Sequence, residues 1–211
     1  MRDIRLTPGI STHKSPISLL AVFAGLLAVF LPLLTVFVAA APSAWAIPPL
    51  PRKSPEFTIV EVSTDGKTPD KQTLLSTYRG KVVLLAFIHT TCIHCQAYTR
   101  VLLKMHKDLG PGFQPIEIAW NPNARMLVPN FVKEFGTDFP VGYNDTYEVI
   151  MNFMGFSVMD RPVVPLAVVI DKKGMIRAQS GPQGDENLQN EGKLRDLIGD
   201  LLKESGPAGK K

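Results

Sequence analysis

The sequence predicts an α/β fold in which helices flank a central, mixed β-sheet. Apolar runs at Lys81–Ile88 and Phe113–Ala119 have the composition of strands that are covered on both faces. Each run is followed by a stretch with helical spacing, and this alternation produces parallel strands joined by right-handed crossovers. Two later runs, Leu166–Ile170 and Met175–Gln179, flank the turn sequence 171–174 and predict an antiparallel hairpin. The hairpin makes the predicted sheet a mixed one.

Shorter segments complete the predicted order of elements. An edge strand at Phe57–Val62 opens the domain, and Gly110-Pro111-Gly112 ends the helix that starts near Ile93. The remaining predicted elements are a strand at Phe139–Gly142 and helices at Met126–Phe135, Thr146–Phe153 and Gly192–Leu202.

The first 46 residues have the pattern of an export signal. Arg2, Arg5 and Lys14 precede an uncharged apolar stretch over residues 17–41, which closes in Ala44-Trp45-Ala46. The small residues at this end favour cleavage after Ala46. The apolar stretch is also long enough to span a bilayer, so an uncleaved membrane anchor is the alternative. Either way, we expect the protein to be periplasmic or otherwise extracytoplasmic, as a soluble or an anchored protein.

The rest of the chain predicts one domain with short extensions. Residues 47–55 carry four prolines in nine positions and predict a stiff, extended linker. We expect the domain to cover residues 56–204 and a flexible tail to cover residues 205–211. Removing the first 46 residues takes away three basic residues and one acidic residue, which lowers the formal charge from +4 to +2 over 165 residues. So small an excess of positive charge predicts no nucleic-acid partner.

The two cysteines of the chain, Cys92 and Cys95, follow the buried strand at Lys81–Ile88 directly. A Cys-x-x-Cys sequence at the junction of a strand and a helix indicates a redox enzyme. Two cysteines three residues apart in the first turn of a helix share a face, and the unpaired N–H groups and dipole of that turn favour a thiolate at Cys92. We therefore expect Cys92 to attack a disulfide of a partner and Cys95 to resolve the mixed disulfide.

Other uses of the cysteine pair are less favoured by the sequence. An inert disulfide across four residues closes a short loop and stabilises a fold weakly. A structural zinc site needs about four ligands, and the chain offers two thiolates and a few scattered histidines. Haem attachment in its usual form needs a histidine after the second cysteine, where Gln96 stands. The sequence therefore predicts no metal and no cofactor. In an oxidising compartment, a membrane redox partner must reset the pair.

Three matched features give the chain a family resemblance. They are Gly80-Lys81-Val82-Val83 at the active-site strand, Cys92-x-x-Cys95 after it, and Val164-Pro165 six residues before Ile170-Asp171. Over residues 57–202 the chain resembles the thioredoxin-like superfamily, in particular the exported thiol-disulfide oxidoreductases of the TlpA/ResA type. The resemblance implies a thioredoxin-like fold with an extra strand-helix unit between the cysteine helix and a cis-proline loop.

The resemblance also implies how the protein binds its substrates. Val164 and Pro165 correspond to the cis-proline loop, which lies beside the cysteine pair and offers its backbone to an incoming peptide. The expected substrates are proteins that bear a disulfide or thiols, in the cell envelope.

The sequence departs from the family around the cysteines. Thr91 stands where relatives carry a tryptophan, and Trp120 either substitutes for that tryptophan or caps the core. Ala86 and Tyr98 occupy positions where relatives place a buried acid that moves the proton of the second cysteine. Without a carboxylate in the motif, this proton would pass to water or to a group remote in sequence.

The sequence does not decide the direction of electron flow, that is, whether the protein acts as a reductase or as an oxidase. His94 lies between the cysteines, as in strongly oxidising relatives, where a histidine at this place stabilises the reduced thiolate and raises the reduction potential. Val164 also resembles those relatives, whereas the fold indicates a reductase lineage.

Two further functions are alternatives to disulfide exchange. His89 and His106 leave room for a copper-binding metallochaperone of the thioredoxin fold, although such proteins usually have a wider cysteine spacing and a distant histidine. A peroxiredoxin-like thiol peroxidase is the other alternative. Its expected threonine, three residues before the reactive cysteine, is replaced by His89.

Overall fold

The computed structural model describes residues 48–63, 68–157 and 159–206. The predicted signal or anchor at residues 1–46 and most of the predicted tail lie outside the described residues. Within the described ranges, none of the helices combines the length and apolar character needed to cross a membrane.

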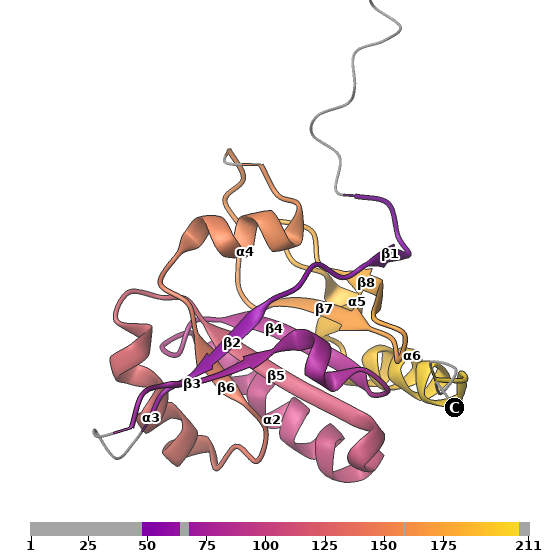
Figure 1. The fold of residues 1–211 in the computed structure, drawn as a ribbon, viewed down its shortest axis with the longest axis horizontal. Helices are drawn as coiled ribbons and strands as arrows, with labels where there is room; N and C mark the ends of the chain where they lie inside the picture. Colours follow the sequence, from indigo (N-terminus) through magenta and orange to yellow (C-terminus); the bar gives the residue numbers. More distant parts are fainter. Residues whose placement is uncertain (1–47, 64–67, 158, 207–211) are drawn as a thin grey trace, which may run out of the picture. The chain divides into compact units, whose positions relative to one another are not determined.

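One mixed sheet forms the centre of the domain (Figure 1), with its strands in the order β1-β8-β7-β4-β5-β6-β2-β3. Strands β4, β5 and β6 are parallel to one another, whereas β7 runs antiparallel to β4 and forms the expected hairpin with β8. The bounds of the strands are β1 Arg52–Lys53, β2 Thr58–Glu61, β3 Lys71–Leu74, β4 Val82–Ile88, β5 Phe113–Ala119, β6 Val141–Tyr143, β7 Leu166–Ile170 and β8 Met175–Gln179.

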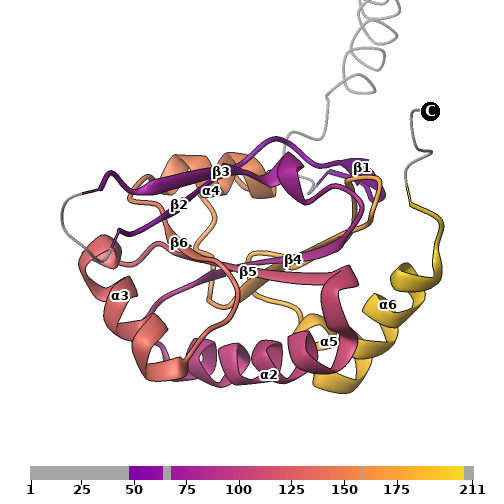
Figure 2. The same ribbon diagram turned by 60° about the horizontal axis from the view of Figure 1, so that its bottom comes forward.

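Helices cover both faces of this sheet. The views in Figures 1 and 2 place α2, α5 and α6 along one face, with α4 on the opposite side. The helices are α2 Ile93–Leu109, α3 Ala124–Phe135, α4 Tyr147–Met154, α5 Glu186–Gln189 and α6 Glu191–Lys203, with single 3-10 turns η1 at Leu75–Tyr78 and η2 at Gly110–Gly112. The predicted α/β fold is confirmed, and so is the extra strand-helix unit, which consists of β6 and α4.

The core has two parts, one on each face of the sheet, because successive residues of a strand point to opposite faces. Leu84 and Ala86 of β4 face a cluster formed with α2, α3 and α6, whereas Leu85 and Phe87 face a cluster formed with α4 and η1. The whole of β4 is buried, as its apolar run predicted.

Some elements were not predicted from the sequence. Part of the predicted linker belongs to the sheet, because Arg52 and Lys53 of β1 pair antiparallel with β8. Arg52 also donates a hydrogen bond to Gln179 Oε1 at 2.7 Å. The prolines around these two residues hid the strand, although proline is compatible with the edge of a sheet. Strand β3, the turn η1 and helix α5 are short and carry weak periodicity, and they were missed for that reason.

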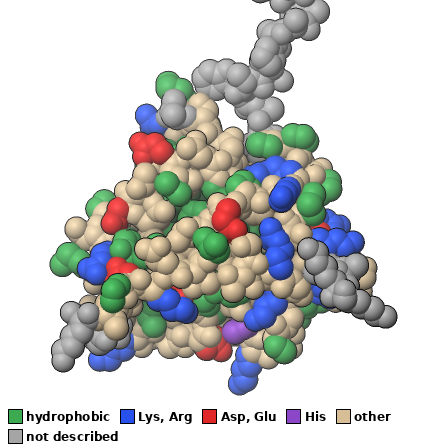
Figure 3. Space-filling model, viewed as in Figure 1, with side chains coloured by type: hydrophobic (Ala, Val, Ile, Leu, Met, Phe, Trp, Pro, Cys, Tyr) green, Lys and Arg blue, Asp and Glu red, His purple; other side chains and the backbone are tan. Residues whose placement is uncertain are grey.

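The surface of the domain carries charged side chains of both signs as well as apolar ones (Figure 3). On the face drawn in Figure 3, lysine and arginine side chains are interspersed with acidic, apolar and uncharged surface.

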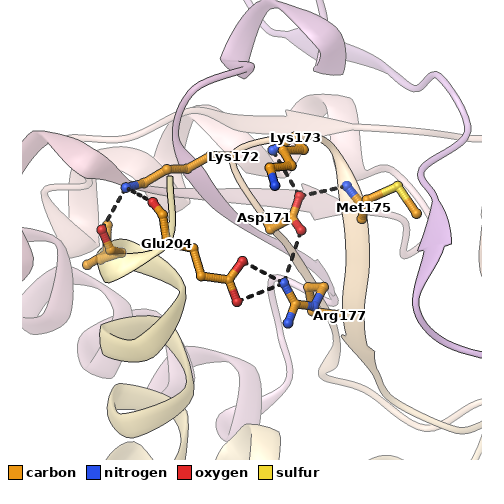
Figure 4. Close-up of polar contacts among 7 residues, drawn as sticks. Asp171, Lys172, Lys173, Met175, Arg177 and Glu204 are labelled. Atoms are coloured by element: carbon orange, nitrogen blue, oxygen red, sulfur yellow. Dashed lines mark hydrogen bonds and ion pairs between the residues drawn. The ribbon is translucent and has the colours of Figure 1, made fainter. Parts of the chain in front are cut away.

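Polar contacts fix the end of α6 to the turn between β7 and β8 (Figure 4). The Arg177 guanidinium donates to the carboxylates of Asp171, at 3.1 Å, and Glu204, at 2.8 Å. Lys172 Nζ donates to the carbonyl oxygen of Leu202 at 2.6 Å and to that of Glu204 at 3.0 Å, and these bonds satisfy backbone groups that the helix end leaves unpaired. Because β7 is antiparallel to β4, this turn lies at the end of the sheet away from Cys92.

Candidate active site

Cys92 lies at the point where the buried strand β4 gives way to helix α2. It is the N-cap residue of α2, with extended backbone angles (φ −83°, ψ 120°), and its carbonyl accepts the first helical hydrogen bond from Gln96 N at 3.0 Å. Its side chain is partly exposed. The structure therefore places Cys92 at the start of a helix, where the first backbone N–H groups have no partner within the helix.

Cys95 lies one turn further along α2 and has no exposed surface. Burial strongly raises the pKa of the Cys95 thiol, because a thiolate loses its hydration there. A hydrogen bond from the backbone of His89 opposes this shift, whereas a hydrogen bond with the Cys92 side chain adds to it. The two thiols therefore differ in access to solvent, and Cys95 needs help to lose its proton.

Asn121 holds the loop between β4 and α2 in place. Its Oδ1 accepts a hydrogen bond from the backbone N–H of Thr90 at 2.9 Å, and both residues are buried. Gln96 Nε2 donates to the carbonyl oxygen of Thr90 at 3.0 Å from the helix side. Thr91 is exposed beside this loop and next to Cys92. Asn121 follows β5, and its role could not be predicted from the sequence because the contact joins two loops that are remote in sequence.

Trp120 packs against the residue three positions before Cys92. Its ring lies edge-on to that of His89, with the centroids 5.0 Å apart, and tilted against that of Tyr147 at 5.5 Å. Trp120 is half-buried and also packs against the core cluster on the α4 face. The ring therefore covers part of the core and contacts His89 in the loop before Cys92. Burial lowers the pKa of His89.

The Val164–Pro165 bond is cis, as the resemblance implied. Pro165 and the exposed His94 line the same surface pocket of about 200 Å³, together with Tyr98 and Gln189. Gln189 Nε2 donates to the carbonyl oxygen of Pro165 at 3.3 Å. The structure thus brings the cysteine helix, the proline loop and α5 together.

Helix α5 also contacts the cysteine helix. The buried Tyr98 hydroxyl donates to the carbonyl oxygen of Leu188 at 2.9 Å. Burial raises the pKa of Tyr98, so the phenol stays neutral and able to donate. Tyr98, which replaces an acid of the relatives, therefore joins α2 to α5.

Glu117 is a buried acid outside the predicted site residues. It lies on β5, fully buried, with its Oε1 accepting a hydrogen bond from Thr99 Oγ1 at 2.8 Å. Burial raises the pKa of Glu117 from 4.5 to about 8, and the Thr99 hydrogen bond lowers it in part. A charged residue inside the apolar run Phe113–Ala119 was the available signal, since a strand covered on both faces has no exposed position for it.

The two histidines that left room for a copper site, His89 and His106, have other contacts in the structure. His106 Nδ1 lies 3.0 Å from Asp138 Oδ1, and its ring packs edge-on to Phe139. Across the described part of the chain, no group of three or more histidine, cysteine or acidic side chains is arranged to hold a metal ion.

A buried cysteine, a partly exposed cysteine at a helix start and a cis-proline loop on this sheet define a thiol-disulfide oxidoreductase of thioredoxin-like fold. The chain belongs to the AhpC/TSA family, whose family model matches residues 51–179. The thiol-disulfide oxidoreductase ResA of Bacillus thuringiensis subsp. konkukian is 27% identical over 144 residues, which cover 65% of this chain and 73% of the relative.

Solved structures show the same architecture. A candidate protein disulfide isomerase from Bacteroides thetaiotaomicron is 28% identical, with a TM-score of 0.56 over 74% of this chain and 91% of the other. A secreted thiol-disulfide isomerase from Corynebacterium glutamicum has a TM-score of 0.58 at 20% identity, over 71% of this chain and 85% of the other, and supports the fold alone.

We predict that Glu117 makes the stability of the protein fall as pH rises. The pKa of Glu117 is raised to about 8 in the folded state, so the folded chain binds more protons than the unfolded chain between about pH 5 and pH 8. Relative to Glu117→Gln, the free energy of unfolding of the wild type should therefore drop by up to ~1.4 kcal/mol per pH unit in this window and stay constant above it.

Urea denaturation at a series of pH values, with both proteins reduced, measures this difference. A pH-independent difference between the two proteins would contradict the raised pKa.

Proposed function

We propose that this protein exchanges disulfides with protein substrates in the cell envelope, with Cys92 as the nucleophile and Cys95 as the resolving cysteine. The observation that carries the proposal is the contrast between the two thiols. Cys92 is partly exposed at the start of α2, whereas Cys95 is fully buried one turn below it. A partner sulfur can reach Cys92 from solvent, whereas Cys95 has no exposed surface and makes a hydrogen bond with the Cys92 side chain.

The exchange has two steps. In the first, the Cys92 thiolate attacks one sulfur of the partner disulfide, forms a mixed disulfide and releases the other partner sulfur as a thiolate. In the second, Cys95 loses its proton and attacks Cys92 Sγ, so that the intramolecular disulfide forms and the remaining partner sulfur leaves as a thiolate. Two electrons pass from the cysteine pair to the partner. The reverse sequence oxidises a dithiol partner.

The residues around Cys92 support binding of an extended, partly apolar peptide. Ile93, which follows Cys92 in the chain, is 74% exposed, and Val163, which precedes Val164, is 45% exposed. We assign substrate binding to the backbone of Val164 and Pro165, and a modulating role to His94. Thr91 is exposed and immediately precedes Cys92. Because Thr91 is smaller than the tryptophan of the relatives, it modulates how closely a partner can approach Cys92.

Substitution of the two cysteines should have different effects. Cys92→Ser should abolish the turnover of insulin disulfides, since the attacking sulfur is gone. Cys95→Ala should stop turnover as well but accumulate mixed disulfides, because attack proceeds and resolution does not. Insulin reduction and non-reducing electrophoresis of envelope extracts measure the two outcomes. Unchanged turnover by Cys92→Ser, or hydrogen peroxide consumption without insulin reduction, would sink the proposal.

His94 should set the reduction potential of the pair. A nearby imidazole that stabilises the Cys92 thiolate favours the reduced form, so His94→Ala should lower the potential by roughly 30 mV, which is a tenfold change in the exchange equilibrium. Equilibration with glutathione buffers measures the potential. His106→Ala, a histidine in the last turn of the same helix, is the matched control and should leave the potential unchanged. A potential at or below that of glutaredoxin indicates a reductase, and one near that of protein disulfide isomerase or above indicates an oxidase or isomerase.

We infer export from residues 1–46 and assign resetting of the pair to a membrane redox partner. The intact mass of protein recovered from the envelope of a bacterial host should correspond to a chain that starts at Ile47. A full-length mass in the membrane fraction would instead support the anchor, and recovery from the cytoplasm would contradict export.

A further inference from the structure

Glu117 is a buried acid that the two exchange steps leave unused. It lies in the middle of β5 and has no exposed surface. Its Oε1 accepts the Thr99 hydrogen bond, whereas its Oε2 has no hydrogen-bond partner among the residues that the structure describes. An ionised carboxylate is costly in such surroundings, and burial raises its pKa to about 8. Glu117 is therefore able to take up or release a proton near neutral pH.

The position of Glu117 directs the carboxyl group toward the cysteine helix. Glu117 pairs with Ala86 in the parallel register of β4 and β5, and paired residues of neighbouring strands point to the same face. Ala86 belongs to the core cluster that also contains Cys95. A methyl group at residue 86 leaves space for the longer side chain of Glu117 under α2.

Thr99 connects the acid to the buried cysteine. Its Oγ1 lies 2.8 Å from Glu117 Oε1 and 3.0 Å from the carbonyl oxygen of Cys95. A hydroxyl has one proton and can donate to only one of these oxygens at a time. Burial raises the pKa of the Cys95 thiol most, and the negative charge of Glu117 raises it further. Two anions are disfavoured in this interior, so Cys95 and Glu117 titrate as a coupled pair.

We propose that Glu117 accepts the proton of Cys95 when the mixed disulfide is resolved, an inference that rests on the function proposed above. The proton moves from Cys95 Sγ to Glu117 Oε2, the oxygen that Thr99 leaves free. Cys95 then attacks Cys92 Sγ, the bond between Cys92 and the partner breaks, and the partner leaves as a thiolate. One negative charge remains in the interior throughout the transfer. Thr99 is a positioning residue, which donates to Glu117 while the carboxyl group is ionised.

Ellman's reagent separates the two steps in the full-length protein. A first coloured thiolate is released when Cys92 attacks, and a second is released when Cys95 displaces the reagent from Cys92. In Glu117→Gln, the first phase should be little changed and the second should slow by roughly a hundredfold at neutral pH. The second phase of the wild type should rise with pH and level off above about pH 8, where Glu117 is ionised. In Glu117→Gln, the rate of the second phase should instead keep rising in proportion to the hydroxide concentration and should not level off near pH 8.

Two further variants make the test specific. Thr99→Val removes the hydrogen bond that lowers the pKa of Glu117, so the levelling of the second phase should move to higher pH. This variant also tests the proposal if Glu117→Gln does not fold. Asp171→Asn changes another buried carboxyl group, at the end of the sheet away from Cys92, and should leave both phases unchanged.

Equal second phases for Glu117→Gln and the wild type at every pH would overturn the role of Glu117. A Cys92→Ser protein that still shows the first phase would instead overturn the function proposed above, so the two failures are distinguishable.

Discussion

Burial of β4 on both faces fixes the geometry around the cysteine pair. No residue of β4 is exposed, and after this strand the chain turns into α2 with Cys92 as the N-cap. The helix then runs back over the sheet, so one turn is enough to bring Cys95 from the surface into the core. The difference between an accessible thiol and a protected thiol follows from this single change of direction, and it gives the two sulfurs different tasks.

The same core contains a polar feature that packing does not require. An apolar residue at position 117 would avoid the cost of burying a carboxyl group with one unpaired oxygen. Such groups persist where the altered protonation equilibrium is useful, and perturbed acids are concentrated at functional sites. The contact of Glu117 with Thr99, which lies on the cysteine helix, places this acid at the active site and not elsewhere in the sheet.

The two ends of the sheet serve different purposes. At the turn between β7 and β8, the ion pairs of Arg177 and the contacts of Lys172 fasten the last helix to the hairpin. At the other end, hydrogen bonds from Gln189 and Tyr98 hold the proline loop and α5 beside the cysteines, while Ile93 stays exposed. Stabilising contacts at the far end leave the exposed residues near Cys92 available to a partner.

The sequence alone determined the α/β class, the long central strands and the identity of the reactive pair, because continuous apolar runs and a Cys-x-x-Cys at a strand-helix junction are local patterns. Short elements such as β1 and α5 carry too few residues for a pattern and form only against partners remote in the chain. The role of Glu117 was hidden for a different reason, since this residue lies in a strand that the sequence did predict. Glu117 comes beside Ala86 and Thr99 through strand pairing and helix packing, and only the tertiary structure decides which side chains meet across neighbouring strands.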